Sequence, residues 1–88
     1  MQDANKKLIL ALSKIIKRYR KLSGKTMYKI SAEASMSKST WREAELGVCN
    51  NITLSTFWKI AEGLEIKPSI LIEEVQIELG ENFSMTDA

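Results

Sequence analysis

The chain of 88 residues is long enough for one small domain, and its apolar content of 44% is too high for a disordered segment. Its single cysteine, Cys49, excludes an internal disulfide bond, and the lack of histidine leaves no set of zinc ligands. The longest apolar runs are too short to span a membrane, and the N-terminal residues lack the apolar stretch and cleavage site of a signal peptide. We therefore expect a cytoplasmic protein with neither a membrane segment nor a metal site.

Apolar residues recur at helical spacing along the chain and predict five helices and no strand. The helices are expected at residues 4–22, 27–34, 38–46, 54–63 and 68–79. The residues suited to start or end them are Asp3, Thr26, Ser37, Gly47, Thr53 and Pro68. The apolar stripe of the first helix is expected to extend to Leu22. Together the helices form one domain, residues 1–79, followed by a flexible tail, residues 80–88.

The net charge of +2 conceals an uneven distribution along the chain. Residues 1–47 hold eleven lysines and arginines against four acidic residues, whereas residues 48–88 hold two against seven. Such a division favours a protein with one face that meets a polyanion. A solvated helix surface with uneven charge explains it equally well, so charge alone does not choose between these interpretations.

The predicted helix over residues 38–46 separates polar from apolar side chains. The polar residues that share one face, by their spacing of three or four, are Lys38, Ser39, Arg42 and Glu43. Trp41 lies toward the other side, where it can anchor the helix. Lysine and arginine can donate to guanine, glutamate can accept from cytosine, and serine can pair with several bases. Only residues 35–37 separate this helix from the preceding one, which is the spacing of a helix-turn-helix.

Residues 25–47, KTMYKISAEASMSKSTWREAELG, resemble the helix-turn-helix of the Cro/repressor type, the XRE family, whose pattern is similar to LSQEELAEKSGVSRSTISRIERG. Residues 52–68, ITLSTFWKIAEGLEIKP, are similar to the family's PSLDTLLKIAKALGVSP, and residues 15–22, IIKRYRKL, are similar to its first helix. The resemblance covers residues 12–72. It implies an all-α, five-helix, lambda-repressor-like DNA-binding domain with its helix-turn-helix at the second and third helices.

The resemblance also implies a role for individual residues in binding double-stranded DNA. Those expected to read bases are Lys38, Ser39, Glu43 and, nearer the backbone or a flanking base, Arg42. Those expected at the DNA backbone are Lys17, Thr26, Met27, Tyr28, Lys29, Ser37, Thr40, Asn50 and Asn51. We expect Trp41, Phe57 and Trp58 to lie in the core rather than to stack on bases.

The chain departs from the family pattern at several positions. Met27 replaces a glutamine, and Trp41 and Ala44 replace two buried isoleucines, so we expect the indole to fill the space that Ala44 leaves. Ser31 replaces a buried alanine and needs a hydrogen-bond partner. Ser35 replaces the turn glycine, and a positive φ there would cost about 1 kcal/mol.

The last helix bears on the oligomeric state, because its apolar residues surround much of its circumference, more than a small domain can bury. The residues expected at a two-fold homodimer interface are Ile70, Leu71, Val75 and Leu79. A dimer would place two recognition helices in successive major grooves, about 34 Å apart, and would favour a near-palindromic operator.

The leading hypothesis is a sequence-specific transcriptional regulator, a repressor that uses no cofactor. The departures keep one alternative open, an antitoxin or other protein-interaction module of a toxin–antitoxin or phage system, with a toxin as its protein partner. We expect no enzymatic activity, because the sequence offers no constellation of nucleophile, base or metal ligands.

Overall fold

The computed structural model of the protein describes residues 2–86, and this part of the chain forms five α-helices and no strand. They are α1 (Gln2–Ser23), α2 (Met27–Glu33), α3 (Lys38–Leu46), α4 (Leu54–Gly63) and α5 (Pro68–Leu79). The predicted all-helical class is confirmed, as are the predicted bounds of the last three helices. Residue 1 and residues 87–88 of the predicted domain and tail lie outside the described part.

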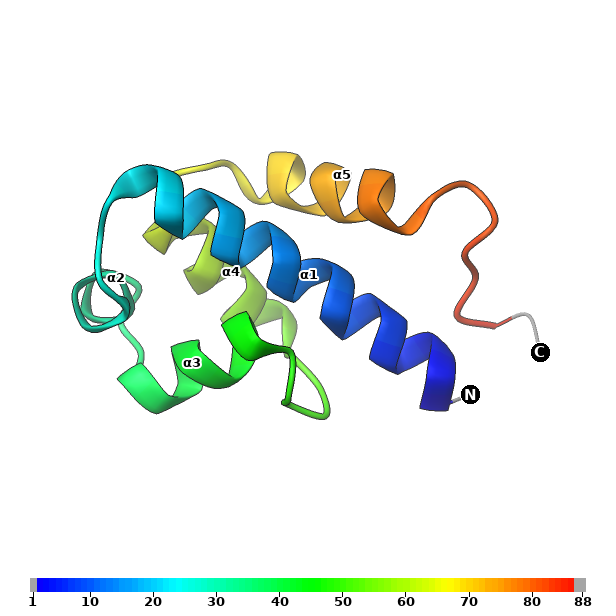
Figure 1. Ribbon diagram of the computed structural model, residues 1–88, viewed down its shortest axis with the longest axis horizontal. Coiled ribbons are helices and arrows are strands. Elements are labelled where there is room, and N and C mark those ends of the chain that lie inside the picture. Colours follow the sequence, from blue (N-terminus) through cyan, green and yellow to red (C-terminus); the bar gives the residue numbers. More distant parts are fainter. Residues whose placement is uncertain (1, 87–88) are drawn as a thin grey trace.

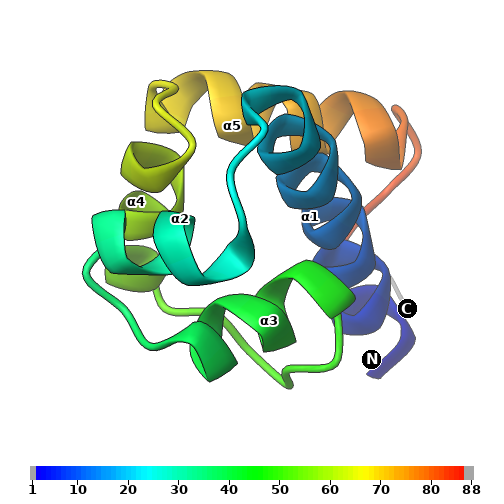
Figure 2. The same cartoon turned by 60° about the vertical axis from the view of Figure 1, so that its left-hand side comes forward.

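The helices surround one apolar core. α1 packs against α3 and α5, α2 packs against α3 and α4, and α4 packs against α5. Figure 1 shows α1 crossing the molecule between α3 and α5, and Figure 2 shows the five helices arranged around the core. None of the helices in residues 2–86 is both long enough and apolar enough to cross a membrane.

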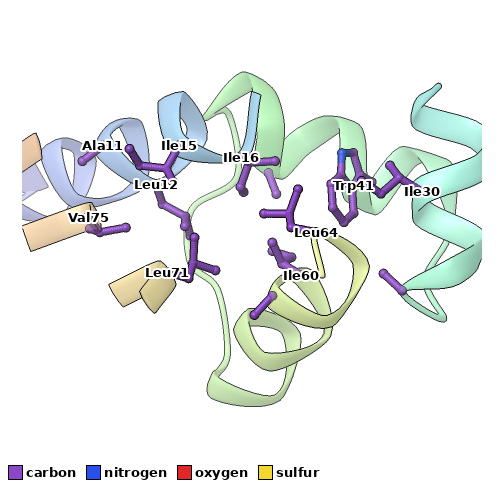
Figure 3. Close-up of a cluster of buried hydrophobic side chains, with 13 residues drawn as sticks. Ala11, Leu12, Ile15, Ile16, Ile30, Trp41, Ile60, Leu64, Leu71 and Val75 are labelled. Atoms are coloured by element: carbon purple, nitrogen blue, oxygen red, sulfur yellow. The ribbon is translucent and has the colours of Figure 1, made fainter. Parts of the chain in front are cut away.

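Trp41 lies in the core where α2, α3 and α4 meet. Its side chain is fully buried, as expected from the sequence, and Figure 3 shows it between Ile30 and Leu64. Gly63 gives it room, because a Cβ there would lie 3.2 Å from the indole and 2.8 Å from the Cβ of Ala34. The close approach of α2, α3 and α4 therefore depends on a large residue at 41 and no side chain at 63.

Four details differ from the sequence-based expectations. Asp3 lies inside the first turn of α1 rather than at its N-cap, because the helix already begins at Gln2. α2 ends at Glu33, so that Ala34 is its C-cap. Leu22 is 77% exposed, because the last turn of α1 extends past the core. Trp58 is 52% exposed, because Ile60 and Ala61 occupy the buried face of α4.

Helices α2, α3 and α4 end in the same way. Each is followed by a residue in the left-handed region, and the next N–H closes the helix with a bond to a carbonyl five residues back. The left-handed residues are Ser35, Gly47 and Glu65, with φ of 58°, 72° and 60°. The bonds run from Met36 N to Ser31 O, from Val48 N to Glu43 O and from Ile66 N to Ala61 O. Ser35 therefore has the positive φ whose cost the sequence analysis considered.

We expect Ser35→Gly to raise the free energy of unfolding by about 0.5–1 kcal/mol, because glycine adopts this conformation without a Cβ clash. Urea denaturation measures the change. Ala32→Gly, within α2, is the matched control and should lower stability by about 1 kcal/mol, since glycine is unfavourable inside a helix. A loss of stability in both variants would contradict the strain assigned to Ser35.

Candidate nucleic-acid interface

Helix α3 presents two different faces. Ser37 caps it, with its Oγ accepting from Thr40 N at 3.1 Å, and Gly47 ends it in the left-handed conformation. The buried residues are Trp41, Ala44 and Glu45. The four residues of the other face, Lys38, Ser39, Arg42 and Glu43, are all exposed. The predicted division of the helix into an inner and an outer face is confirmed.

The charged side chains on the outer face of α3 have no partner within the described part of the chain. The side chains of Lys38, Arg42 and Glu43 make neither a hydrogen bond nor an ion pair with another described residue. Ser39 is in contact with the capping residue, since its Oγ lies 3.2 Å from Ser37 Oγ. The face therefore offers charged donors and acceptors that no described side chain occupies.

An ion pair between a buried carboxylate and a partly buried guanidinium holds α3 against α1. Arg20 Nε donates to Glu45 Oε1 at 2.6 Å, and Arg20 Nη2 donates to Glu45 Oε2 at 2.7 Å. Trp41 Nε1 donates to Glu45 Oε1 at 2.9 Å, so the carboxylate accepts from both helices. Arg20 Nη1 also donates to Lys25 O at 3.0 Å, which ties the segment before α2 to the same group.

The surroundings of Glu45 keep it ionised. Burial by itself raises its pKa, but the hydrogen bonds from Arg20 and Trp41 and the charges of Arg20 and Lys17 outweigh burial and hold the pKa below its usual value. The hydrogen bond from Glu45 likewise raises the pKa of Arg20. Both groups are therefore charged at neutral pH.

This pair was not predicted from the sequence, although the sequence carries a signal for Glu45. Glu45 follows Trp41 by four residues, so the two share the inner face of α3. An acid on a buried face needs a partner, because an unpaired buried charge is costly. Nothing in the sequence identifies Arg20, which lies 25 residues away along the chain.

The start of α2 places two of the predicted DNA-backbone residues at the surface. Thr26 caps the helix, with its Oγ1 accepting from Lys29 N, and Tyr28 and Lys29 are exposed. Met27 is partly buried against the core, which leaves its backbone rather than its side chain for such a contact. Ser31 donates to Tyr28 O at 3.0 Å, so its expected need for a partner is met.

The loop after α3 contributes Asn50 and Asn51, both exposed. Asn51 Oδ1 accepts from Ile52 N at 2.9 Å, and Asn50 O accepts from Asn5 Nδ2 at 2.7 Å. The second bond fixes the loop to the first turns of α1. The side-chain amide of Asn50 makes no hydrogen bond with another described residue.

Ion pairs within the molecule remove part of the positive charge that the sequence assigned to one face. Lys14 Nζ lies 3.3 Å from Glu78 Oε2, and Arg18 Nη1 lies 3.4 Å from Glu74 Oε1, which joins α1 to α5. Lys25 pairs with Glu33 at 2.6 Å. Lys17, Lys29, Lys38 and Arg42 form no ion pair with any described residue.

The predicted dimer residues of α5 need a correction. Leu71 and Val75 are fully buried in the core of the single chain, because this stripe of α5 packs against α1 and α4. Leu79 is partly buried against the same core, and Ile70 is exposed. Leu71 and Val75 are therefore not available to a second copy.

Comparison of the chain with protein-family models, with curated proteins and with solved structures finds no match. No group of three or more potential metal ligands is assembled within the described residues. The assignment to the XRE family therefore stays a prediction that depends on the sequence pattern.

We expect Glu45→Gln to lower the free energy of unfolding by about 3 kcal/mol, because it leaves the Arg20 guanidinium beside a neutral amide. Glu62→Gln, an exposed change on α4, is the matched control and should change stability by less than about 0.5 kcal/mol. Chemical denaturation at neutral pH compares the two. Equal effects would show that the ion pair contributes no stability of its own.

The same variant should change the pH dependence of stability. The folded-state pKa of Glu45 lies below its unfolded value, so its contribution is present above the unfolded pKa and is lost as pH falls through the folded pKa. As pH is lowered from neutral to acid, the free energy of unfolding should therefore decrease less steeply for Glu45→Gln than for the wild type. Parallel curves would contradict the depressed pKa.

Proposed function

We propose that the protein is a lambda-repressor-like, XRE-type transcriptional regulator that inserts α3 into the major groove of double-stranded DNA and represses by occupying its operator. The observation that carries the proposal is the outer face of α3, where Lys38, Arg42 and Glu43 are exposed and unpaired. Side chains of these types match the hydrogen-bonding groups of base edges.

The rigidity of α3 supports this role. A nine-residue helix is only marginally stable alone, yet this one is capped at both ends and is held against the core by its buried residues Trp41 and Glu45. A helix held in this way can present side chains to base edges without first becoming ordered, which favours affinity.

The connection between α2 and α3 also fits a helix-turn-helix. Four residues, 34–37, separate the two helices, and the left-handed Ser35 turns the chain between them. In such motifs the second helix reads the groove while the first crosses the backbone. The exposed Tyr28 and Lys29 at the start of α2 would then approach phosphates, together with Lys17 of α1 and the loop of Asn50 and Asn51.

Selection from a pool of random DNA duplexes, at two salt concentrations, tests the proposal. We expect an enriched inverted repeat whose half-sites are about 10 base pairs apart, as two recognition helices on one DNA face require. The affinity should fall as salt rises, because phosphate contacts release counterions. Binding without any enriched sequence would contradict base reading by α3.

Two lysine variants separate base reading from phosphate attraction. Lys38→Ala should relax the preference at one base pair by about 1–3 kcal/mol. Lys17→Ala should weaken all sequences alike and reduce the salt slope of log K by about 1. Lys14→Ala, whose ammonium group is paired with Glu78, is the matched control and should change the slope less. The same loss of preference in the Lys38 and Lys17 variants would contradict the division of roles.

A further inference from the structure

Helix α1 begins well before the part of the chain that resembles the XRE family. The resemblance starts at residue 12, whereas α1 starts at Gln2. We call residues 2–11 the α1 extension; at 1.5 Å per residue it lengthens the helix by about 15 Å. Ile9 and Ala11 of the extension are buried, whereas Lys6 and Lys7 are exposed. The family pattern gives none of these residues a role.

The α1 extension runs beside the loop that follows α3. At one end of this loop, Gly47 lies against α1, because a Cβ there would lie 2.9 Å from Leu10 Cδ2 and 3.0 Å from Ser13 Oγ. Further along the loop, Asn50 O accepts from Asn5 Nδ2 at 2.7 Å. The loop therefore follows α1 toward its N-terminus, and the two segments form one continuous surface.

Lys6 lies at the edge of this surface. It is four residues before Leu10 and seven before Ser13, so it shares the face of α1 that meets Gly47. Its side chain is exposed and forms no ion pair with any described residue. Lys7 points to a different side, since it lines a hollow between α1 and the tail. The two lysines therefore carry the same charge in different directions.

The first turns of α1 lie on the same side of the molecule as the recognition helix. Figures 1 and 2 both show α3, the loop after it and the N-terminal end of α1 along one side, with α5 on the opposite side. In Figure 1 the loop lies between α3 and the N-terminal end of α1. A DNA duplex that covers α3 and the loop would therefore reach the α1 extension next.

We propose that the α1 extension is a further DNA-backbone contact, in which Lys6 pairs with a phosphate beyond those that Asn50 and Asn51 approach. The inference rests on the proposed function and deepens it by lengthening the DNA segment that the protein covers. Successive phosphates of one strand are about 3.4 Å apart along the duplex axis, so about 15 Å of helix can pass several of them. Because the extension is already helical and is tied to the loop through Asn5, little order has to be gained on binding.

The acidic residues near Lys6 leave its charge available. Asp3 is the acidic residue in the first turn of α1, three residues before Lys6 and four before Lys7, and it pairs with neither. Glu78 of α5 pairs instead with Lys14 and Arg18. Since Asp3 is close in sequence to both lysines, a difference between them reports the direction of the side chain rather than the local charge.

The salt dependence of binding to a pool of random DNA duplexes, measured by fluorescence anisotropy, tests the contact. Lys6→Ala should reduce the slope of log K against log salt by about 0.9, so the advantage of the wild type should shrink about 3.5-fold between 50 and 200 mM salt. Lys7→Ala, the matched control on the same turn, should change the slope by less than half as much. Lys6→Arg should restore it, and circular dichroism verifies that all three variants fold.

A scan of single phosphates locates the contact on the selected DNA sequence. Replacing one phosphate at a time by a neutral methylphosphonate should weaken the wild type about threefold at a position outside those assigned to the loop, as expected for one exposed ion pair. Lys6→Ala should lose the sensitivity at that position and keep it at the others. A Lys6→Ala variant with the sensitivity of the wild type at every position would overturn the inference.

The outcomes separate this inference from the proposed function. If the protein selects a DNA sequence but Lys6→Ala and Lys7→Ala change the salt slope equally, the inference is overturned and the function survives. If Lys6→Ala alone reduces the slope but no sequence is enriched, the contact is supported and base reading by α3 is contradicted. Absence of any DNA binding contradicts both.

Discussion

The structure depends most on one buried carboxylate. Glu45 is 3% exposed, and it accepts hydrogen bonds from Arg20 of α1 and Trp41 of its own helix. Removing two charges from water is costly, and in a small core an apolar pair of similar shape could be equally stable. An apolar pair, however, would not hold the two helices in one fixed orientation. The bidentate contact fixes the rotation of α3 about its axis, so it also fixes which side chains face outward.

Packing around the indole of Trp41 also restricts the orientation of α3. Trp41 fills the space between α2, α3 and α4, and Gly63 permits the approach, since any side chain there would meet Ala34 and the indole ring. Ala44, next to Glu45 on the same face, remains small and buried. A large residue at 41, a small one at 44 and no side chain at 63 therefore together allow α2, α3 and α4 to pack closely.

The parts of this fold that local chemistry decides could be predicted. Thr26, Ser37 and Thr53 cap their helices because each side chain accepts the N–H three residues later, an interaction within one turn. The contacts between helices could not be predicted in the same way. Trp58 and the Leu71–Val75 stripe were placed wrongly because α4 and α5 are apolar on several sides, and only the positions of their neighbours decide which side is buried.

The ion pairs between helices could not be predicted from the sequence either. The sequence shows a basic half and an acidic half, but the structure pairs Lys14 and Arg18 of α1 with Glu78 and Glu74 of α5. These exposed pairs contribute little stability. Their larger effect is on the field of the molecule, because they neutralise positive charge on the side of α1 that faces α5. Among the cations that remain unpaired, Lys17, Lys29, Lys38 and Arg42 belong to α1, α2 and α3.

This arrangement gives the surface three regions of different character. Lys17, Lys29, Lys38 and Arg42 lie unpaired on α1–α3, and ion pairs cover the contact of α1 with α5. The third region is an apolar groove between α1, α4 and α5 whose lining carries one charged residue, Lys67. A polyanion is attracted only to the first of these, and an apolar surface gains most by covering the third. The third region does not include the outer face of α3, so DNA bound in the proposed way would leave it uncovered.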